Sequence, residues 1–186
     1  MDVVREAMRV IERRGFLRPE HQDDAAVDRP LPIGNDQSNS QPRTVADMLV
    51  LLDVAAGMRV LDVGAGSGWT TALLAHLVGP GGHVVGVELD HQIASWGATN
   101  LARHAMGWAR LEPARSGVLG WPDEAPYDRV LVSAQAQELP GELVDQLTVG
   151  GVMVVPVNGT MTRVQRFGPD DLHVTEHGAY RFVPLR

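Results

Sequence analysis

The feature that most constrains this chain is a short apolar run, residues 60–63, which ends in three closely spaced glycines, Gly64, Gly66 and Gly68. Glycines at the end of a buried strand let the backbone approach a ligand closely, and the N-terminus of a following helix favours negative charge. Glu88 stands one strand–helix–strand unit later, where a carboxylate can accept hydrogen bonds from two ribose hydroxyls. The sequence therefore predicts a nucleotide-cofactor site.

The spacing of the glycines distinguishes between two cofactors. The dinucleotide fingerprint G-x-G-x-x-G needs its third glycine at position 69, where this chain has Trp69. The pattern that is present, G-x-G-x-G, is the commoner form in methyltransferases that use S-adenosylmethionine. We therefore expect S-adenosyl-L-methionine as the cofactor, with S-adenosyl-L-homocysteine as its product.

Helix-like and strand-like segments alternate along the chain, which is typical of right-handed crossovers and a parallel sheet. Predicted strands cover residues 60–63, 83–87, 129–132 and 152–157, and predicted helices cover residues 3–13, 45–52, 72–77, 93–105 and 142–147. Two final strand-like runs, residues 162–167 and 180–185, predict an antiparallel pair at a sheet edge, joined by the polar segment 168–178.

The predicted fold is a Rossmann-like, doubly wound α/β domain with a mostly parallel sheet, antiparallel edge strands and an N-terminal helical cap. We expect one domain over residues 1–186, with N-terminal helices and a covering loop in residues 1–57 and the core in residues 58–186. Residues 15–41 lack periodicity and contain several prolines, so they are predicted to form an extended loop. Loops of that length are often functional.

Composition narrows the class of protein. A formal net charge of −7 disfavours nucleic-acid substrates, and no apolar stretch is long enough to span a membrane. The chain contains no cysteine, which excludes thiol chemistry. The first residues carry charges of both signs, so we expect a cytoplasmic protein, with a monomer as the default.

A metal site is not expected. His173 and His177 are four residues apart, but they lie in a segment that is predicted to be a loop, and no third ligand stands at a suitable spacing.

A second motif resembles that of a known family. Residues 30–42, PLPIGNDQSNSQP, are similar to the PLPIGxGQTISQP signature of protein-L-isoaspartate (D-aspartate) O-methyltransferases. The resemblance continues through the glycine loop and through Gly120 and Trp121, and it ends at residues 182–185, so that it covers nearly the whole chain.

This resemblance implies transfer of the methyl group of S-adenosylmethionine to the free carboxylate of L-isoaspartyl (D-aspartyl) residues in damaged proteins and peptides. On that basis Ser40 is the candidate catalytic residue, because it matches the family's serine next to the transferred methyl. From the residues alone, Ser40 is also a candidate N-cap for the next helix. The resemblance implies substrate contacts from Ile33, Gly34, Gln37, Ser38 and Asn39.

The candidate cofactor-binding residues are Asp62, Gly64, Ala65, Gly66, Ser67, Gly68, Glu88, Leu89, Ser116 and Gly117. Among them, Asp62 is polar at a position that should be buried. We expect its carboxylate to accept hydrogen bonds from backbone N–H groups of the glycine loop, or else to face the neighbouring helix.

Three residues depart from the family pattern. Asp36 replaces a glycine, Asn39 replaces an isoleucine, and Ser116 stands where the family has an aspartate that binds adenine. These changes leave two alternatives open. One is a methyltransferase of the same fold that acts on another carboxylate or a small molecule, and the other is a catalytically silent module that binds S-adenosylmethionine.

Overall fold

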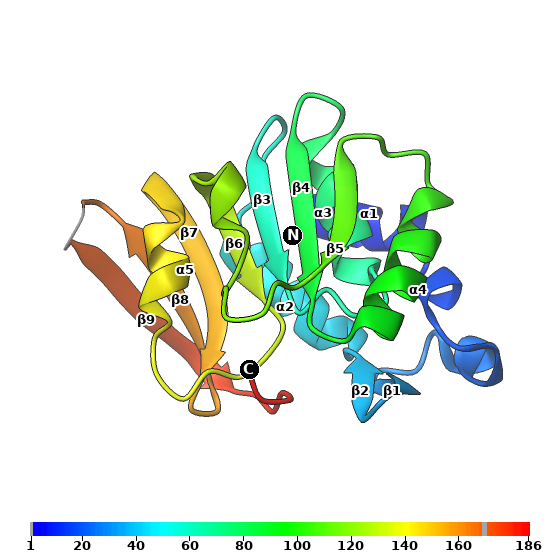
Figure 1. Ribbon diagram of the computed structural model, residues 1–186. Helices are drawn as coiled ribbons and strands as arrows, with labels where there is room; N and C mark the ends of the chain where they lie inside the picture. Colours follow the sequence, from blue (N-terminus) through cyan, green and yellow to red (C-terminus); the bar gives the residue numbers. More distant parts are fainter. Residues whose placement is uncertain (1, 169–170) are drawn as a thin grey trace.

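The computed structural model describes residues 2–168 and 171–186, which form a seven-stranded sheet with helices on both faces (Figure 1). Five parallel strands make up most of the sheet: β3 (Arg59–Val63), β4 (His83–Glu88), β5 (Ala109–Pro113), β6 (Tyr127–Val132) and β7 (Leu147–Val157). Two antiparallel strands, β8 (Thr160–Arg166) and β9 (Leu172–Ala179), complete it. The spatial order is β5-β4-β3-β6-β7-β8-β9, which confirms the predicted doubly wound α/β fold.

The helices cover the two faces unequally. Four of them, α1 (Asp2–Val10), α2 (Pro42–Leu52), α3 (Trp69–Val78) and α4 (His91–Ala102), contribute to one buried cluster. Helix α5 (Gly141–Asp145) packs on the opposite face together with side chains such as Leu119. Strand residues alternate between these clusters, since Val60 belongs to the first and Leu61 to the second. Most of α3 is buried because α1, α4 and the sheet all contact it.

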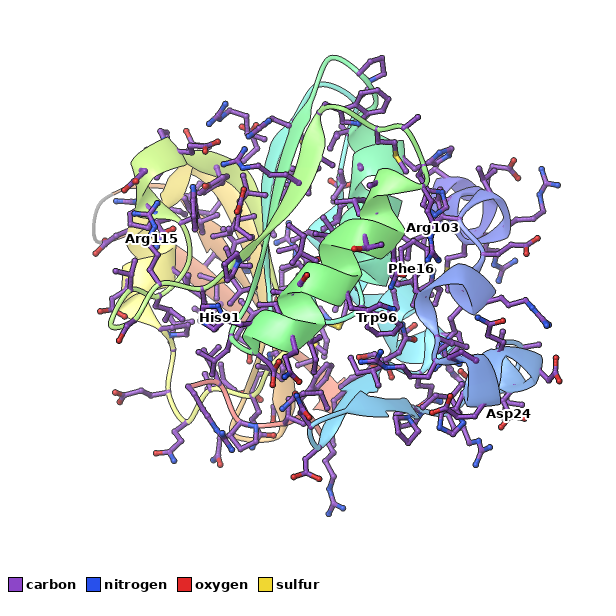
Figure 2. The ribbon with its side chains drawn as sticks, turned by 45° about the vertical axis from the view of Figure 1, so that its right-hand side comes forward. Phe16, Asp24, His91, Trp96, Arg103 and Arg115 are labelled. Atoms are coloured by element: carbon purple, nitrogen blue, oxygen red, sulfur yellow. The ribbon has the colours of Figure 1, made fainter. Side chains whose placement is uncertain are left out.

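The predicted extended loop over residues 15–41 is wrong. This segment forms two short 3-10 helices, Arg13–Phe16 and Pro19–Asp24, and an antiparallel hairpin of β1 (Leu31–Gly34) and β2 (Gln37–Asn39). Such short elements are too brief for a periodic pattern, and hydrogen bonds to distant residues hold them in place. Figure 2 shows Phe16 and Asp24 along this segment.

One loop prediction and one strand prediction fail at the antiparallel edge of the sheet. Residues 172–178 of the predicted loop 168–178 belong to strand β9 (Leu172–Ala179), whereas residues 180–185, predicted to be a strand, form no extended strand and run toward the carboxyl ends of the parallel strands. Residues 169–170 of the predicted loop lie outside the described residues. Strand β5 was not predicted, because Leu111 is its only buried side chain. Both edge strands bury few residues, so the apolar alternation that marks a strand is weak.

Among the helices within residues 2–168 and 171–186, none is long and apolar enough to cross a bilayer.

Candidate active site

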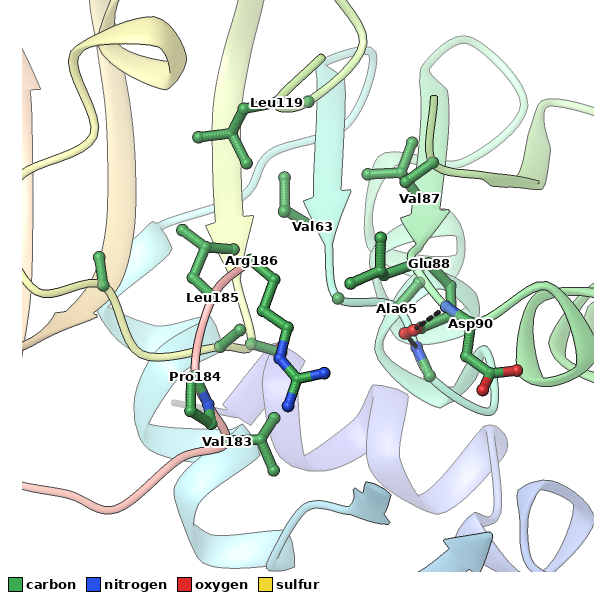
Figure 3. A pocket seen from close by; sticks show the side chains of 18 of the residues that line it. Val63, Ala65, Val87, Glu88, Asp90, Leu119, Val183, Pro184, Leu185 and Arg186 are labelled. Carbon is green, nitrogen blue, oxygen red and sulfur yellow. Dashed lines mark hydrogen bonds between the residues drawn. The ribbon is translucent and has the colours of Figure 1, made fainter. Parts of the chain in front are cut away.

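A cavity of about 1110 Å³ lies at the carboxyl ends of β3, β4 and β6. Open α/β sheets bind their ligands at this position. The β1–β2 hairpin borders the cavity on one side and the C-terminal residues on another. Figure 3 shows Ala65, Glu88 and Asp90 at one end, and Val183, Pro184, Leu185 and Arg186 across the cavity from them.

Most of the predicted site residues line this one cavity. They are Ile33, Gln37, Ser38, Asn39, Ser40, Gly64, Ala65, Gly66, Ser67, Glu88, Leu89, Ser116 and Gly117. Gly34, Asp62 and Gly68 do not line it. Residues that are far apart in the sequence therefore meet at one place, as the resemblance implied.

The glycine loop has a backbone that requires glycine. Gly64, Gly66 and Gly68 have φ values of +77°, +53° and +87°, in the region that other residues rarely adopt. The N–H groups of Gly64 and Ala65 both donate to Val87 O, at 2.9 and 3.0 Å. Gly68 is the N-cap of α3 and has no side chain to cap the helix, so the first N–H groups of α3 are available to an anion.

Glu88 is buried beside the glycine loop with only 7 % of its surface exposed. Its Oε2 accepts from Gly66 N at 2.9 Å, and its Oε1 accepts from Asp90 N at 3.0 Å. A carboxylate has about four acceptor positions, so roughly one remains on each oxygen. These free positions suit the two hydroxyls of a ribose.

Asp62 lies behind the glycine loop and is fully buried. Its Oδ2 accepts from the hydroxyls of Thr70 and Thr71, both at 2.7 Å, while Oδ1 has no partner among the described residues. Burial raises the pKa of Asp62 to about 6, and the two threonine hydroxyls oppose that shift. Asp62 therefore faces helix α3, and the expected bonds from loop N–H groups are absent among these contacts.

The far end of the cavity, at Ser116 and Gly117, is exposed. Beside it, Arg115 pairs with Asp123 at 2.7 Å, and the Arg115 guanidinium lies 4.0 Å from the centre of the Trp121 ring. Surface pairs of this kind contribute little to stability. This end of the cavity is consequently held less firmly than the glycine loop.

Ser40 does not cap helix α2. The N-cap is Gln41, which makes no side-chain capping bond, and Pro42 begins the helix. The backbone oxygen of Ser40 accepts from Arg13 Nη2 at 3.0 Å, but the Ser40 hydroxyl takes part in none of the hydrogen bonds found among the described residues. That hydroxyl is free to act on a ligand in the cavity.

Comparison with known proteins identifies the chain. Residues 1–186 match the model of the family "Protein-L-isoaspartate(D-aspartate) O-methyltransferase (PCMT)". The chain belongs to this methyltransferase family. It is 41 % identical over 188 residues to the protein-L-isoaspartate O-methyltransferase of Methanopyrus kandleri, an alignment that covers 98 % of this chain and 82 % of that one. It is 44 % identical over 192 residues to the homologue from Methanothrix thermoacetophila, covering 97 % and 86 %.

A solved member of the methyltransferase family has the same fold. The crystal structure from Plasmodium falciparum, described as a protein-L-isoaspartate O-methyltransferase in complex with S-adenosyl-L-homocysteine, superposes with a TM-score of 0.86. The superposition covers 100 % of this chain and 91 % of the other at 22 % identity, a level that supports the fold alone.

As a member of the family, the protein is a methyltransferase that uses S-adenosylmethionine. The site fits that cofactor, because the uncapped start of α3 can receive a carboxylate and Glu88 can receive a ribose. Leu89, half exposed in the cavity, offers an apolar surface to a base. The same features also suit S-adenosylhomocysteine.

Sequence reasoning missed several residues of the cavity. Asn35 Nδ2 donates to Asp90 Oδ2 at 2.7 Å, which ties the β1–β2 hairpin to the start of α4. The tail 183–186 reaches the cavity because Gln135 N donates to Val183 O at 2.7 Å and Leu185 N donates to Gln135 O at 2.8 Å. The Asn35-Asp36 pair, which forms the hairpin turn with positive φ values, was a local signal for the first of these contacts.

Histidines do not assemble into a metal site in the described part of the chain, where no group of three potential ligands was found. His173 and His177 lie on β9, and His177 Nε2 contacts the hydroxyl of Thr175 at 2.8 Å.

Proposed function

We propose that this protein methylates the free carboxylate of L-isoaspartyl, and of D-aspartyl, residues in damaged proteins and peptides, so that they can be repaired. The observation that supports this most directly is the cavity in which the Ser40 hydroxyl, the glycine loop and Glu88 all lie. The family match over residues 1–186 supplies the substrate class. S-adenosylmethionine supplies a methyl group on a positively charged sulfonium when bound.

Each part of the cavity has a proposed task in holding the cofactor. The first N–H groups of α3 bind the amino-acid end, and Glu88 accepts from the ribose hydroxyls. Leu89 packs on the base, while Ser116 accepts one hydrogen bond from its amino group. Asp62 supports the loop from behind through its hydrogen bonds to α3.

The acceptor carboxylate needs no strong base. A carboxyl group with an ordinary pKa near 3.9 is ionised at neutral pH, so positioning supplies the rate enhancement. We assign that role to the Ser40 hydroxyl, which donates a hydrogen bond to one carboxylate oxygen and leaves the other to attack. Ile33, Gln37 and Ser38 border the space in which the peptide would lie.

The departure at Asp36 is compatible with an anionic substrate. Asp36 is exposed at the turn of the β1–β2 hairpin and is not among the residues that line the cavity. Water and salt screen a charge at such a position, so its repulsion of a carboxylate inside the cavity is weak.

We also propose that residues 1–186 act as one domain, in which residues 1–57 complete the site, and that the protein works as a monomer in the cytoplasm. Support for the single domain comes from Trp69 Nε1, which donates to Ile11 O at 3.0 Å and joins α3 to the N-terminal segment. Gel filtration and cell fractionation test the other two proposals.

The decisive experiment offers labelled S-adenosylmethionine and two peptides, one with an isoaspartyl residue and one with aspartate at the same position. Base-labile label on the first peptide alone is expected. Ser40→Ala should lower kcat by about 10-fold or more while S-adenosylhomocysteine affinity, measured by calorimetry, changes little.

Two results would contradict this proposal. If neither peptide is labelled although S-adenosylhomocysteine binds, a different methyl acceptor or a silent binding module replaces it. If Ser40→Ala weakens cofactor binding as much as it slows turnover, Ser40 does not act on the substrate.

A further inference from the structure

An arginine, Arg13, is buried beside the β1–β2 hairpin. Arg13 is 4 % exposed, and none of the salt bridges among the described residues includes it. Burial lowers the pKa of Arg13 to about 10, so the side chain remains a cation at neutral pH. Burying a cation costs free energy unless hydrogen bonds replace its hydration. The groups that accept hydrogen bonds from Arg13 therefore indicate its role.

The five N–H groups of the Arg13 guanidinium reach six oxygens, all uncharged, so that one N–H of Nη2 is shared between two acceptors. Five acceptors are backbone carbonyls, of Ala25, Val27, Arg29, Asn39 and Ser40, at 2.9 to 3.4 Å. The sixth is the side-chain Oδ1 of Asn39, which Nε reaches at 2.7 Å. Arg13 thus fixes the backbone carbonyls on both sides of the Ser40 Cα.

Asn39 extends this network into the cofactor site. The side chain is 5 % exposed, and its Nδ2 donates to Ser67 Oγ in the glycine loop at 2.9 Å. Because Arg13 Nε is a donor, Asn39 must turn its oxygen toward Arg13 and its NH₂ group toward Ser67. One side chain therefore connects the segment that precedes Ser40 to the loop that holds the cofactor.

We propose that Arg13 and Asn39 are positioning residues, which set the place of the Ser40 hydroxyl relative to the glycine loop; this inference rests on the proposed function. The isoleucine that the family usually has at position 39 fills space but cannot form either hydrogen bond. In this chain the Asn39 side chain links Arg13 directly to Ser67 of the glycine loop through these two hydrogen bonds. A shift of about 1 Å between a catalytic group and the reacting atoms can cost on the order of 100-fold in rate.

The N-terminal segment has other anchors, so loss of this link need not unfold it. Phe16, Leu31 and Ile33 are fully or almost fully buried, and Trp69 Nε1 still binds Ile11 O. Breaking the link should therefore move Ser40 without releasing the segment from the core.

The test compares substitutions that keep or remove the two contacts. Asn39→Leu has a similar size and removes both, whereas Asn39→Asp can still accept from Arg13 Nε and from the Ser67 hydroxyl. We expect Asn39→Leu to lower kcat about 10- to 100-fold with little change in S-adenosylhomocysteine affinity. Asn39→Asp should restore most of kcat. Gln41→Leu, which removes only a surface hydrogen bond to Asp28, is the matched control.

A second comparison tests whether Arg13 and Asn39 act as one unit. Arg13→Lys keeps the charge and loses the fork of donors. If the two residues act through the same link, the double variant Arg13→Lys/Asn39→Leu should turn over about as slowly as the slower single variant. Additive losses would overturn the proposed link.

Amide hydrogen exchange of the cofactor-free protein provides a readout that is independent of activity. Asn39→Leu should speed exchange in peptides that cover residues 37–41 and 64–68, and Asn39→Asp should not. Unchanged exchange in both peptides, or equal losses in kcat and cofactor affinity, would overturn the inference. If the unmodified protein labels no isoaspartyl peptide, the proposed function fails and the exchange data alone decide the role of Asn39.

Discussion

The two ends of the cavity differ in how they are held. At the glycine loop, Gly66 N and the backbone N–H of Asp90 both bind Glu88, and a Cβ added to Gly97 of α4 would lie 2.5 Å from Gly66 O. At the other end, Ser116 and Gly117 are exposed, and the neighbouring backbone bonds are those of Ala114 N to Glu88 O at 2.8 Å and of Val118 N to Arg115 O at 3.2 Å. We therefore expect the glycine-loop end to set the position of the cofactor, and the exposed end to change mainly its affinity.

The largest expected effect comes from breaking the rigid end. Gly97→Ala would place a methyl group 2.5 Å from Gly66 O and 2.9 Å from Leu111 Cδ1, so α4 and the glycine loop must separate. We expect the free energy of unfolding to fall by about 3 kcal/mol and cofactor affinity by about 10-fold or more. Denaturant unfolding and calorimetry measure both.

Gly107→Ala is the matched control, because nothing lies within 4 Å of a Cβ at that position. Equal changes in the free energy of unfolding and in cofactor affinity for the two variants would show that the contact between α4 and the glycine loop is not tight.

The second largest effect is a pH dependence of stability that arises from Asp62, behind the glycine loop. Its pKa is raised to about 6 in the folded protein, against 3.8 without the surroundings. Between these values the unfolded chain releases the proton and the folded protein keeps it, so the free energy of unfolding falls as pH rises from about 4 to 6. The loss amounts to about 2 to 3 kcal/mol.

Asp62→Asn cannot ionise, and its amide oxygen can still accept from Thr70 and Thr71. Urea unfolding of both proteins at several pH values between 4 and 7 measures the difference in stability. We expect the unmodified protein to lose stability relative to Asp62→Asn across that range. A difference that stays constant with pH would contradict the assigned burial of the charge.

The smallest effect is expected at the exposed end. Ser116→Asp introduces an ionised acceptor where the family has an aspartate, and hydrogen bonds to charged acceptors are stronger than those to hydroxyls. We expect S-adenosylhomocysteine to bind about 5-fold more tightly, a gain of about 1 kcal/mol.

Ser95→Asp, which adds the same charge on the exposed side of α4, should leave calorimetric affinity unchanged. Weaker binding by Ser116→Asp would mean that Ser116 does not face the base and that the exposed end of the cavity does not hold the adenine.

The core of the fold and of the site was predictable because its signals are local. Strand β3, the glycine loop and Glu88 lie within one strand–helix–strand unit. The strand buries a nearly continuous apolar run, and the glycines of the loop need a backbone conformation with positive φ. Strand β9 was missed because its residues are largely exposed, which removes the apolar alternation.

The sequence by itself determined the alternation of helices with the central strands β3, β4, β6 and β7, the glycine loop, its acidic partner and the family, since these depend on short patterns of residue type. Only the tertiary structure decided that Asn39 joins Arg13, 26 residues away, to Ser67, 28 residues away, and that Asp62 faces two threonines. Such contacts depend on how distant segments pack, and a hydrogen bond between two ordinary polar residues leaves no pattern along the chain.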